Sequence, residues 1–272
     1  MWYESLKFEN PKTVEEALNC LATDGAKVIA GGTDELVQLR EKKKGIKKLV
    51  NIGDIKPLKK IKKKDNTLII GACVTYSEFL EFASESLPPL TDAIKQIASP
   101  SIRNIATFGG NIVNASPAGD TLPILYAFDA ELVLESLQGK RVVKISDFIT
   151  GPGITILQKG ELLTEIRINI PSFTYYYRKL GPRKALALSK VSFCGVHLTV
   201  SDEIRLAYGS VGPTVIRAYE AEKLYKRGQK DKIPDLINKL VQPINDQRST
   251  AEYRLSLIHI SEPTRPLYIS YA

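Results

Sequence analysis

The chain has 272 residues, of which 43% are hydrophobic and 25% are charged, a composition typical of globular proteins long enough to bury a substantial core. No apolar run approaches the roughly 20 residues of a membrane-spanning helix, and the first residues lack a secretory signal pattern. Cys20, Cys73 and Cys194 lie far apart, and the histidines are His197 and His259. We therefore expect a cytoplasmic protein without a metal centre or iron–sulfur cluster of its own.

The net charge of +8 is concentrated in one segment. Residues 40–64 contain twelve Lys or Arg side chains against two acidic ones, Glu41 and Asp54. A nucleic-acid-binding surface would interleave such charges with aromatic or base-reading residues, and this segment has none. We interpret it as a solvated helix end and loop, with docking to an acidic partner subunit as the second alternative.

The first part of the chain predicts a βαβ-like unit. Thr13 and Glu16 form a capping box that opens an amphipathic helix. Two short apolar runs, 27–30 and 49–52, are predicted strands, and a helix is predicted between them over 34–43.

A second α/β unit begins with a predicted strand over 68–72 and a helix over 76–84, which Thr75 and Glu78 open as a second capping box. Its further predicted elements are a helix after Pro89 up to Ala98, a helix over 123–128, a hairpin of 131–134 and 141–144, and a strand over 162–170. The segment 99–120 is rich in Gly, Asn, Ser and Pro and has no clean period. We expect it to be irregular and functional.

Beyond Pro171 the pattern becomes that of an antiparallel sheet followed by helices. The expected strands and helices lie within 175–177, 191–200, 204–208 and about 216–240. The predicted fold class is α+β, with a domain boundary at 171–173. The predicted domains are residues 1–171, divided into subdomains 1–56 and 57–171, and a small C-terminal α+β domain of residues 172–254.

Two glycines interrupt the first predicted strand–helix junction, in the run Lys27-Val28-Ile29-Ala30-Gly31-Gly32-Thr33-Asp34. Glycine lets the backbone approach a ligand closely, and free amide groups at a helix start can bind a pyrophosphate. A diglycine turn is structural more often than functional, however. This one is neither a Rossmann G-x-G-x-x-G nor a P-loop, so alone it indicates little.

A second diglycine follows about eighty residues later, in Thr107-Phe108-Gly109-Gly110-Asn111, and leads to Asp120. Such a segment can offer amide groups to a phosphate and the Asp120 carboxylate to ribose hydroxyls. Asp120 is equally suited to cap the next helix. Two such turns in successive α/β units are more specific than one, provided that they lie close together in the folded chain.

The runs AGGTD and TFGGNIVNASPAGD resemble the FAD-binding domain, of PCMH type, of the xanthine dehydrogenase and carbon monoxide dehydrogenase flavoproteins. The segments ELLTEIRINIP and YRKLGPRKALALSKVS are similar to the same family, and the latter opens its small C-terminal domain. The resemblance covers residues 1–254 in order. It implies FAD bound non-covalently, because neither histidine lies in a glycine turn.

The resemblance also implies FAD contacts. The turns Lys27 to Asp34 and Thr107 to Asn111 would surround the pyrophosphate, and Asp120 would bind ribose or ribityl hydroxyls. The remaining implied contacts are Ile97 near the flavin or its chain, Leu162 near the adenine or flavin ring, and Lys179 at a flavin or phosphate oxygen. Ile97 replaces an aromatic residue of some relatives, which argues against stacking there. From the residues alone, Leu162 reads as strand core and Lys179 as a solvated lysine.

The resemblance further implies an electron-transfer role in a heteromeric complex. A molybdenum-cofactor subunit would hydroxylate a purine or another N-heterocycle, an iron–sulfur subunit would pass electrons to this chain, and FAD would reduce NAD⁺ or another acceptor. No catalytic side chain is assigned, because the flavin performs the chemistry. The alternatives are a self-contained flavin oxidase or reductase of the same fold, and a non-enzymatic protein that uses the lysine-rich segment to bind nucleic acid or an acidic subunit.

The last segment, residues 255–272, departs from the family pattern. Pro263 and Pro266 are incompatible with a regular helix, and the apolar residues lack its period. The run LSLIHISEPTRPLYISYA resembles translated adapter or vector sequence. We expect it to be non-native and irregular or poorly packed, with no role for His259.

Overall fold

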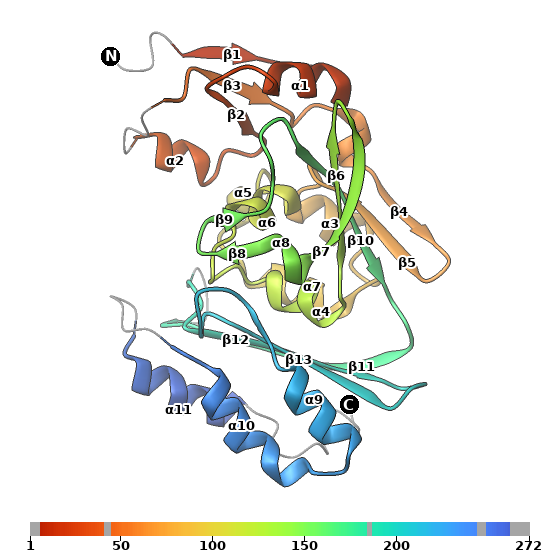
Figure 1. Cartoon of the computed structure of the whole chain (residues 1–272), viewed down its shortest axis with the longest axis vertical. Helices are drawn as coiled ribbons and strands as arrows, with labels where there is room; N and C mark the ends of the chain where they lie inside the picture. Colours follow the sequence, from red (N-terminus) through yellow and green to blue (C-terminus); the bar gives the residue numbers. More distant parts are fainter. Residues whose placement is uncertain (1–5, 41–44, 184–186, 244–248, 262–272) are drawn as a thin grey trace.

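The computed structural model describes residues 6–40, 45–183, 187–243 and 249–261. Three parts follow one another along the long axis of the molecule (Figure 1). A small N-terminal subdomain carries a three-stranded sheet, a central subdomain is built on a five-stranded sheet, and a C-terminal domain has a four-stranded sheet with helices on its outer side. The α+β fold class predicted from the sequence is confirmed.

The N-terminal subdomain contains the predicted βαβ unit. Strands β2 (Ala26–Ile29) and β3 (Lys48–Asn51) are parallel neighbours, and α2 (Glu35–Arg40) lies between them in the chain. An additional strand, β1 (Lys7–Glu9), pairs with the other side of β3. Helix α1 (Val14–Leu21) supplies buried apolar residues to a core shared with β3.

The central sheet has the strand order β4-β5-β10-β6-β7, and all neighbours are antiparallel. Its strands are β4 (Ile61–Lys64), β5 (Thr67–Gly71), β6 (Glu131–Ser136), β7 (Gly139–Lys144) and β10 (Leu162–Asn169). In the middle of the sheet Ile166 pairs with Ile70 on one side and Leu132 on the other, and all three side chains are buried. The apolar residues of these strands thus contribute to the main core.

Most of the other elements of the central subdomain lie to the left of β4, β5 and β10 in the view of Figure 1. The other elements are η1 (Lys56–Lys59), α3 (Tyr76–Phe82), α4 (Pro88–Lys95), α5 (Pro100–Arg103), α6 (Phe108–Asn114), α7 (Leu122–Ala127), α8 (Ile145–Phe148), β8 (Ile149–Gly151) and β9 (Ile154–Thr155). At the start of α3, Thr75 and Glu78 make both hydrogen bonds of the predicted capping box. At the start of α1 the box is incomplete, because the Glu16 carboxylate accepts from the Lys12 amide instead.

The segment 99–120 is more regular than its sequence predicts. It forms α5 and α6, although α6 contains two adjacent glycines and two asparagines. Thr107 caps α6 by accepting a hydrogen bond from the Gly110 amide, and Phe108 and Ile112 are fully buried. Burial and capping therefore outweigh the poor helix propensity of this segment.

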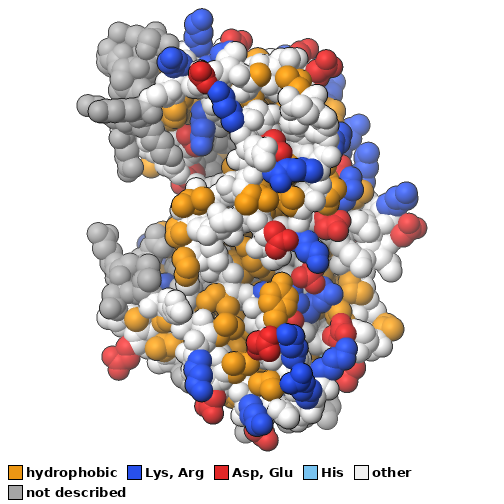
Figure 2. All heavy atoms as spheres, in the orientation of Figure 1, with side chains coloured by type: hydrophobic (Ala, Val, Ile, Leu, Met, Phe, Trp, Pro, Cys, Tyr) orange, Lys and Arg blue, Asp and Glu red, His pale blue; other side chains and the backbone are white. Residues whose placement is uncertain are grey.

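Part of the lysine-rich segment is also placed differently from the prediction. Lys62, Lys63 and Lys64 do not lie in a helix end or loop but in β4, the edge strand of the central sheet. Their side chains are exposed, and basic side chains gather over the β4–β5 hairpin in the space-filling view (Figure 2). Lysines on an edge strand oppose pairing with strands of other molecules. Residues 41–44 of the segment lie outside the described residues.

The C-terminal sheet is an antiparallel meander in the order β11-β12-β13-β14, as predicted for most of its strands. Its elements are β11 (Phe173–Leu180), β12 (Val191–Leu198), β13 (Glu203–Gly209), β14 (Ile216–Arg217), α9 (Tyr219–Lys226), η2 (Lys230–Lys232), α10 (Ile233–Leu240) and α11 (Ala251–Ser261). One face of β12, with Cys194 and Val196, joins the core of the central subdomain, while Phe193 on the other face packs toward the helices. The sheet is therefore buried on both sides.

Helix α11 corrects the prediction for the start of the last segment. Residues 255–261 are helical, and Leu257 and Ile258 are buried in the core beneath β12 and β13. Packing against this apolar surface stabilises the helix although the apolar residues lack a helical period. Pro263 and Pro266 lie beyond the helix and outside the described residues, as does the side chain of His259. The proposed non-native origin of 255–272 stays a prediction.

Candidate functional site

The two diglycine turns lie against each other in the folded chain. A Cβ atom added to Gly31 would penetrate the carbonyl group of Ile105, which stands between α5 and α6 just before the second turn. Gly31 is therefore required for backbone-to-backbone contact between the first turn and the segment that leads into the second. Near them the molecule is hollowed between the N-terminal subdomain and the remainder of the chain (Figure 2).

A side-chain bridge reinforces this contact. The Gln38 side-chain amide donates both to the Asp34 carboxylate in the first turn and to Asn114 Oδ1, 3.2 Å away, at the end of α6. Because α2 carries Gln38 and begins at the first turn, the bridge fixes the orientation of α2 relative to α6. Sequence reasoning did not select Gln38 or Asn114, since their meeting depends on tertiary structure.

The first turn exposes hydrogen-bond donors. Within the described residues, the backbone N–H groups of the turn donate no hydrogen bond; they are those of Gly31, Gly32, Thr33 and Asp34. Gly32 has a φ of +67°, a conformation that side-chain-bearing residues rarely adopt. Clustered amides of this kind at a strand–helix turn suit an anionic ligand such as a pyrophosphate. This geometry fits the ligand predicted for the run Lys27 to Asp34.

The second turn differs, because its helix N-terminus is already satisfied. The amides of Phe108 and Gly109 donate to the carbonyl groups of Val74 and Ala72, and the Gly110 amide donates to Thr107 Oγ1 at 3.1 Å. The side chain of Asn111 accepts a hydrogen bond of 2.6 Å from Thr121. These amides are therefore not free to bind a phosphate as expected, and the second turn contributes shape and positioning instead.

Asp120 is buried at the junction of the central subdomain and the C-terminal domain. Its Oδ2 atom lies 2.6 Å from Lys179 Nζ on β11, and its Oδ1 atom accepts a hydrogen bond from Ser189. Burial raises the pKa of the Asp120 carboxyl group, while Lys179 and Ser189 oppose this increase. Asp120 does not cap α7, because Thr121 occupies that position.

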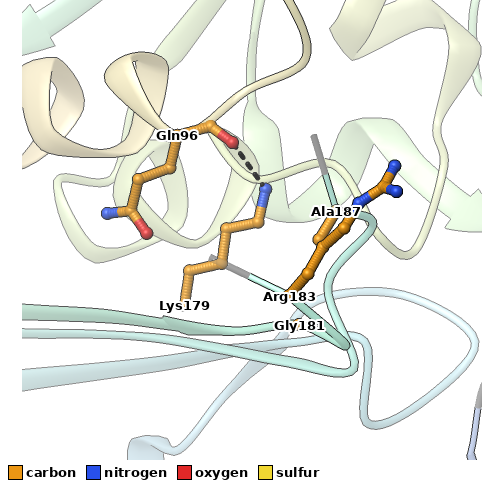
Figure 3. A pocket seen from close by; sticks show the side chains of 5 residues that line it. All are labelled: Gln96, Lys179, Gly181, Arg183 and Ala187. Atoms are coloured by element: carbon orange, nitrogen blue, oxygen red, sulfur yellow. Dashed lines mark hydrogen bonds between the residues drawn. The ribbon is translucent and has the colours of Figure 1, made fainter. Parts of the chain in front are cut away.

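Lys179 is buried rather than solvated, with 6% of its side chain exposed. Its ammonium group also donates to the carbonyl oxygen of Gln96, 3.0 Å away at the end of α4. Lys179 and Gln96 line a cavity of about 160 Å³, together with Gly181, Arg183 and Ala187 from the β11–β12 connection (Figure 3). Pockets for drug-sized ligands measure about 300–1,000 Å³, so this cavity is smaller than a complete pocket of that kind.

Ile97 and Leu162 lie apart from each other. Ile97 follows α4 next to Gln96, is half-buried, and offers its carbonyl oxygen to Arg103 at 2.7 Å. Leu162, at the start of β10, is 3% exposed and belongs to the core cluster against which Val28 and Ala30 pack. Leu162 is thus a core residue of its strand that packs near the first turn. This is the role that its sequence context alone predicts.

The described part of the chain lacks two features, a metal-binding cluster and a membrane-spanning helix. It contains no group of three or more His, Cys, Asp or Glu side chains that could hold a metal ion. None of its helices combines the length and the apolar character required to cross a membrane.

Residues 4–172 match the family described as the FAD binding domain in molybdopterin dehydrogenase, and residues 175–260 match the CO dehydrogenase flavoprotein C-terminal domain. The chain belongs to the FAD-binding subunits of the molybdopterin dehydrogenases. The C-terminal match includes most of α11, which agrees with its packing in the C-terminal core.

Individual members of this family align over nearly the whole chain. The xanthine dehydrogenase FAD-binding subunit of Escherichia coli O157:H7 is 31% identical, covering 94% of this chain and 93% of its own. The glyceraldehyde dehydrogenase medium chain of Sulfolobus acidocaldarius is 29% identical, with 96% of each covered. The structure of carbon monoxide dehydrogenase from Hydrogenophaga pseudoflava superimposes with a TM-score of 0.87 at 26% identity, covering 98% of this chain and 97% of that chain. The relatives are dehydrogenases, so the family is one of oxidoreductases.

Proposed function

We propose that this chain binds FAD non-covalently and is the electron-transfer subunit of a cytoplasmic molybdenum hydroxylase complex. The observation that carries the proposal is the contact between the two diglycine turns, where Gly31 packs on the Ile105 carbonyl and the first turn presents unpaired amides. Family membership supplies the identity of the ligand.

Each part of the site would hold a different part of the cofactor. The amides of the first turn would bind the pyrophosphate, and the second turn would support the first through its backbone contact at Ile105. Asp120, Lys179 and Ile97 would face the flavin, ribityl or ribose portion near the cavity beside Gln96. When bound, FAD supplies the capacity to accept single electrons and to deliver an electron pair.

The proposed partners are an iron–sulfur subunit as electron donor and a molybdenum-cofactor subunit as the site of hydroxylation. A purine such as xanthine, or another N-heterocycle, is the proposed substrate class, and NAD⁺ is the proposed acceptor. The relative from Escherichia coli, named for xanthine, supports this choice. Named relatives also include enzymes of glyceraldehyde and carbon monoxide, so the substrate must be measured.

The decisive experiment is purification of the chain with its co-transcribed partners. We expect a flavin absorbance spectrum, release of FAD on acid denaturation, and xanthine-dependent reduction of NAD⁺ by the complex. Flavin that stays with the denatured polypeptide would contradict non-covalent binding. Substrate-dependent flavin reduction by the chain alone would instead favour a self-contained oxidase or reductase.

A complex that contains FAD but oxidises another substrate would refute only the proposed purine. Absence of flavin from a folded complex, even after incubation with FAD, would refute the proposal as a whole. The lysine-rich alternative predicts a protein without flavin whose binding to nucleic acid weakens steeply with salt.

A further inference from the structure

The Asp120 carboxylate belongs to the central subdomain, but the two side chains that hydrogen-bond to it within the described residues come from the C-terminal domain. Lys179 on β11 reaches one carboxylate oxygen, and Ser189, just before β12, reaches the other. Asp120, Lys179 and Ser189 are all buried, and Ser189 is 0% exposed. A buried carboxylate without such donors would be strongly destabilised, so this arrangement fixes the carboxylate in one orientation.

The same carboxylate determines where the Lys179 ammonium group lies. Lysine has three N–H donors on a flexible stem. Two of them are used by Asp120 at 2.6 Å and by the Gln96 carbonyl oxygen at 3.0 Å. Within the described residues the third has no acceptor, and the side chain lines the cavity beside Arg183 and Ala187. The ammonium group is thus held at the cavity by two fixed oxygens, of which Figure 3 shows the Gln96 carbonyl oxygen.

We propose that Ser189 is a positioning residue for the cofactor site: it fixes the Asp120 carboxylate, which in turn holds the Lys179 ammonium group at the cavity. The inference rests on the proposed FAD binding and deepens it. It makes the C-terminal domain a contributor to cofactor affinity through a side chain that lies behind the cavity rather than in its lining.

A matched control is available in the same domain. Ser192, on β12, is also 0% exposed, but within the described residues its hydroxyl group has no hydrogen-bond partner. Ser189→Ala removes a hydrogen bond to a buried charge, whereas Ser192→Ala removes an equally buried hydroxyl that makes none. The two variants therefore separate positioning of Asp120 from loss of a buried oxygen atom.

The experiment measures FAD affinity of the flavin-depleted full chain by flavin fluorescence quenching. We expect Ser189→Ala to weaken binding by roughly ten-fold or more, the cost of a hydrogen bond to a charged group. Ser192→Ala should match wild type, and Ser189→Thr, which keeps a hydroxyl group, should recover most of the affinity. Unfolding by denaturant of all four proteins without FAD shows whether each is folded.

The pH dependence provides a readout that a general structural defect would not change. Besides Lys179 and Ser189, the groups near Asp120 are the phenols Tyr76 on α3 and Tyr177 on β11, and burial raises the pKa of both. Both phenols stay neutral while Asp120 titrates. Removing Ser189 raises the pKa of Asp120 further, and its protonation releases Lys179. FAD affinity of Ser189→Ala should therefore fall at a higher pH than that of wild type when the pH is lowered.

The outcomes distinguish this inference from the proposed function. If Ser189→Ala binds FAD as tightly as Ser192→Ala with the same pH profile, the positioning role is wrong while FAD binding stands. If Ser189→Thr is as weak as Ser189→Ala in a folded protein, the role of the hydroxyl group is likewise refuted. If wild type binds no FAD, the proposed function itself fails.

Discussion

At the scale of single residues, the four glycines of the two turns differ in why a side chain would or would not be tolerated at each position. Gly31 and Gly109 contact backbone: a Cβ atom would meet the Ile105 carbonyl at the former and the Ala72 carbonyl oxygen, at 2.7 Å, at the latter. Gly32 is required for its positive φ. Gly110 is exposed, and a Cβ atom there would meet only Thr107 Oγ1, at 3.0 Å. Close backbone packing within the fold therefore involves Gly31 and Gly109, not Gly110.

Gly32→Ala tests the first turn directly. An alanine at φ +67° is strained by roughly 1–2 kcal/mol, and relaxation of that strain would rotate the free amides of the turn. We expect a loss of FAD affinity of ten-fold or more, measured by fluorescence titration. Gly228→Ala is a matched control, because Gly228 has a φ of +72° with open space around it and lies far along the chain.

Gly228→Ala should lose similar stability but keep its flavin. Gly32→Val, with a bulkier side chain at the same φ, should abolish flavin content. A folded Gly32→Val variant that retains its full yellow colour would contradict the role assigned to the first turn.

At the scale of elements, capping decides where several helices begin. Thr75 and Glu78 bond reciprocally at the start of α3, and the sequence spacing alone predicts this helix. Lys59 lies 3.1 Å from the same carboxylate and ties η1 to α3. Burial opposes ionisation of Glu78, but the Thr75 amide and Lys59 outweigh it, so its pKa lies below the ordinary value of 4.5.

This lowered pKa predicts how the stability contributed by Glu78 changes as the pH falls. The charged Glu78 stabilises the folded state fully above pH 4.5, and this contribution is lost as the pH falls through the lower pKa of the folded protein. Glu78→Gln keeps the capping hydrogen bond but does not titrate. We expect the stability advantage of wild type over Glu78→Gln, measured by denaturant unfolding, to shrink as the pH falls below 4.5. With Glu81→Gln, an exposed control on the same helix, such a change is not expected.

At the scale of the whole molecule, a buried charge network joins the C-terminal domain to the central subdomain. Arg217, with 4% of its side chain exposed, donates to the Tyr126 carbonyl oxygen at 2.6 Å and pairs with Asp129 at 2.9 Å. Within the C-terminal domain it forms an ion pair with Glu222, whose carboxylate also accepts a hydrogen bond from the Leu206 amide. Arg217 therefore connects α7, β13 and α9 across the junction.

Arg217→Met should destabilise the protein by on the order of 3 kcal/mol, because it leaves the Glu222 carboxylate without its partner in a mostly buried position. The matched control is Lys223→Met, which breaks an ion pair with Glu220 at the surface and should cost less than about 1 kcal/mol. Urea unfolding measures both. Equal effects would show that the network does not stabilise the junction.

The packing of α11 leads to a prediction for the last segment. Ile258 is 0% exposed in the core beneath the C-terminal sheet. Ile258→Ala should therefore lower the free energy of unfolding by about 2–5 kcal/mol, whereas the exposed Glu252→Ala should change it by less than about 0.5 kcal/mol. Rapid proteolysis within residues 255–261 of the folded protein, or no effect of Ile258→Ala, would restore the sequence-based expectation of poor packing.

Much of the architecture could be predicted from local sequence patterns. Short apolar runs bounded by turn residues predicted the central strands and most of the C-terminal sheet, and the Thr75–Glu78 spacing predicted the start of α3. The diglycine turns and their place in successive α/β units were equally legible, because glycine positions mark special backbone geometry. These features depend on residues close together in the chain.

Other features required the tertiary structure, because they depend on contacts between residues far apart in sequence. Helices α6 and α11 form through burial that outweighs weak local preference. Gly31 contacts the Ile105 backbone, and Ser189 donates a hydrogen bond to Asp120, only once separate parts of the chain have packed together. The sequence by itself therefore identified the turns and the family, whereas tertiary packing decided which amides are free and which side chains hold the buried charge.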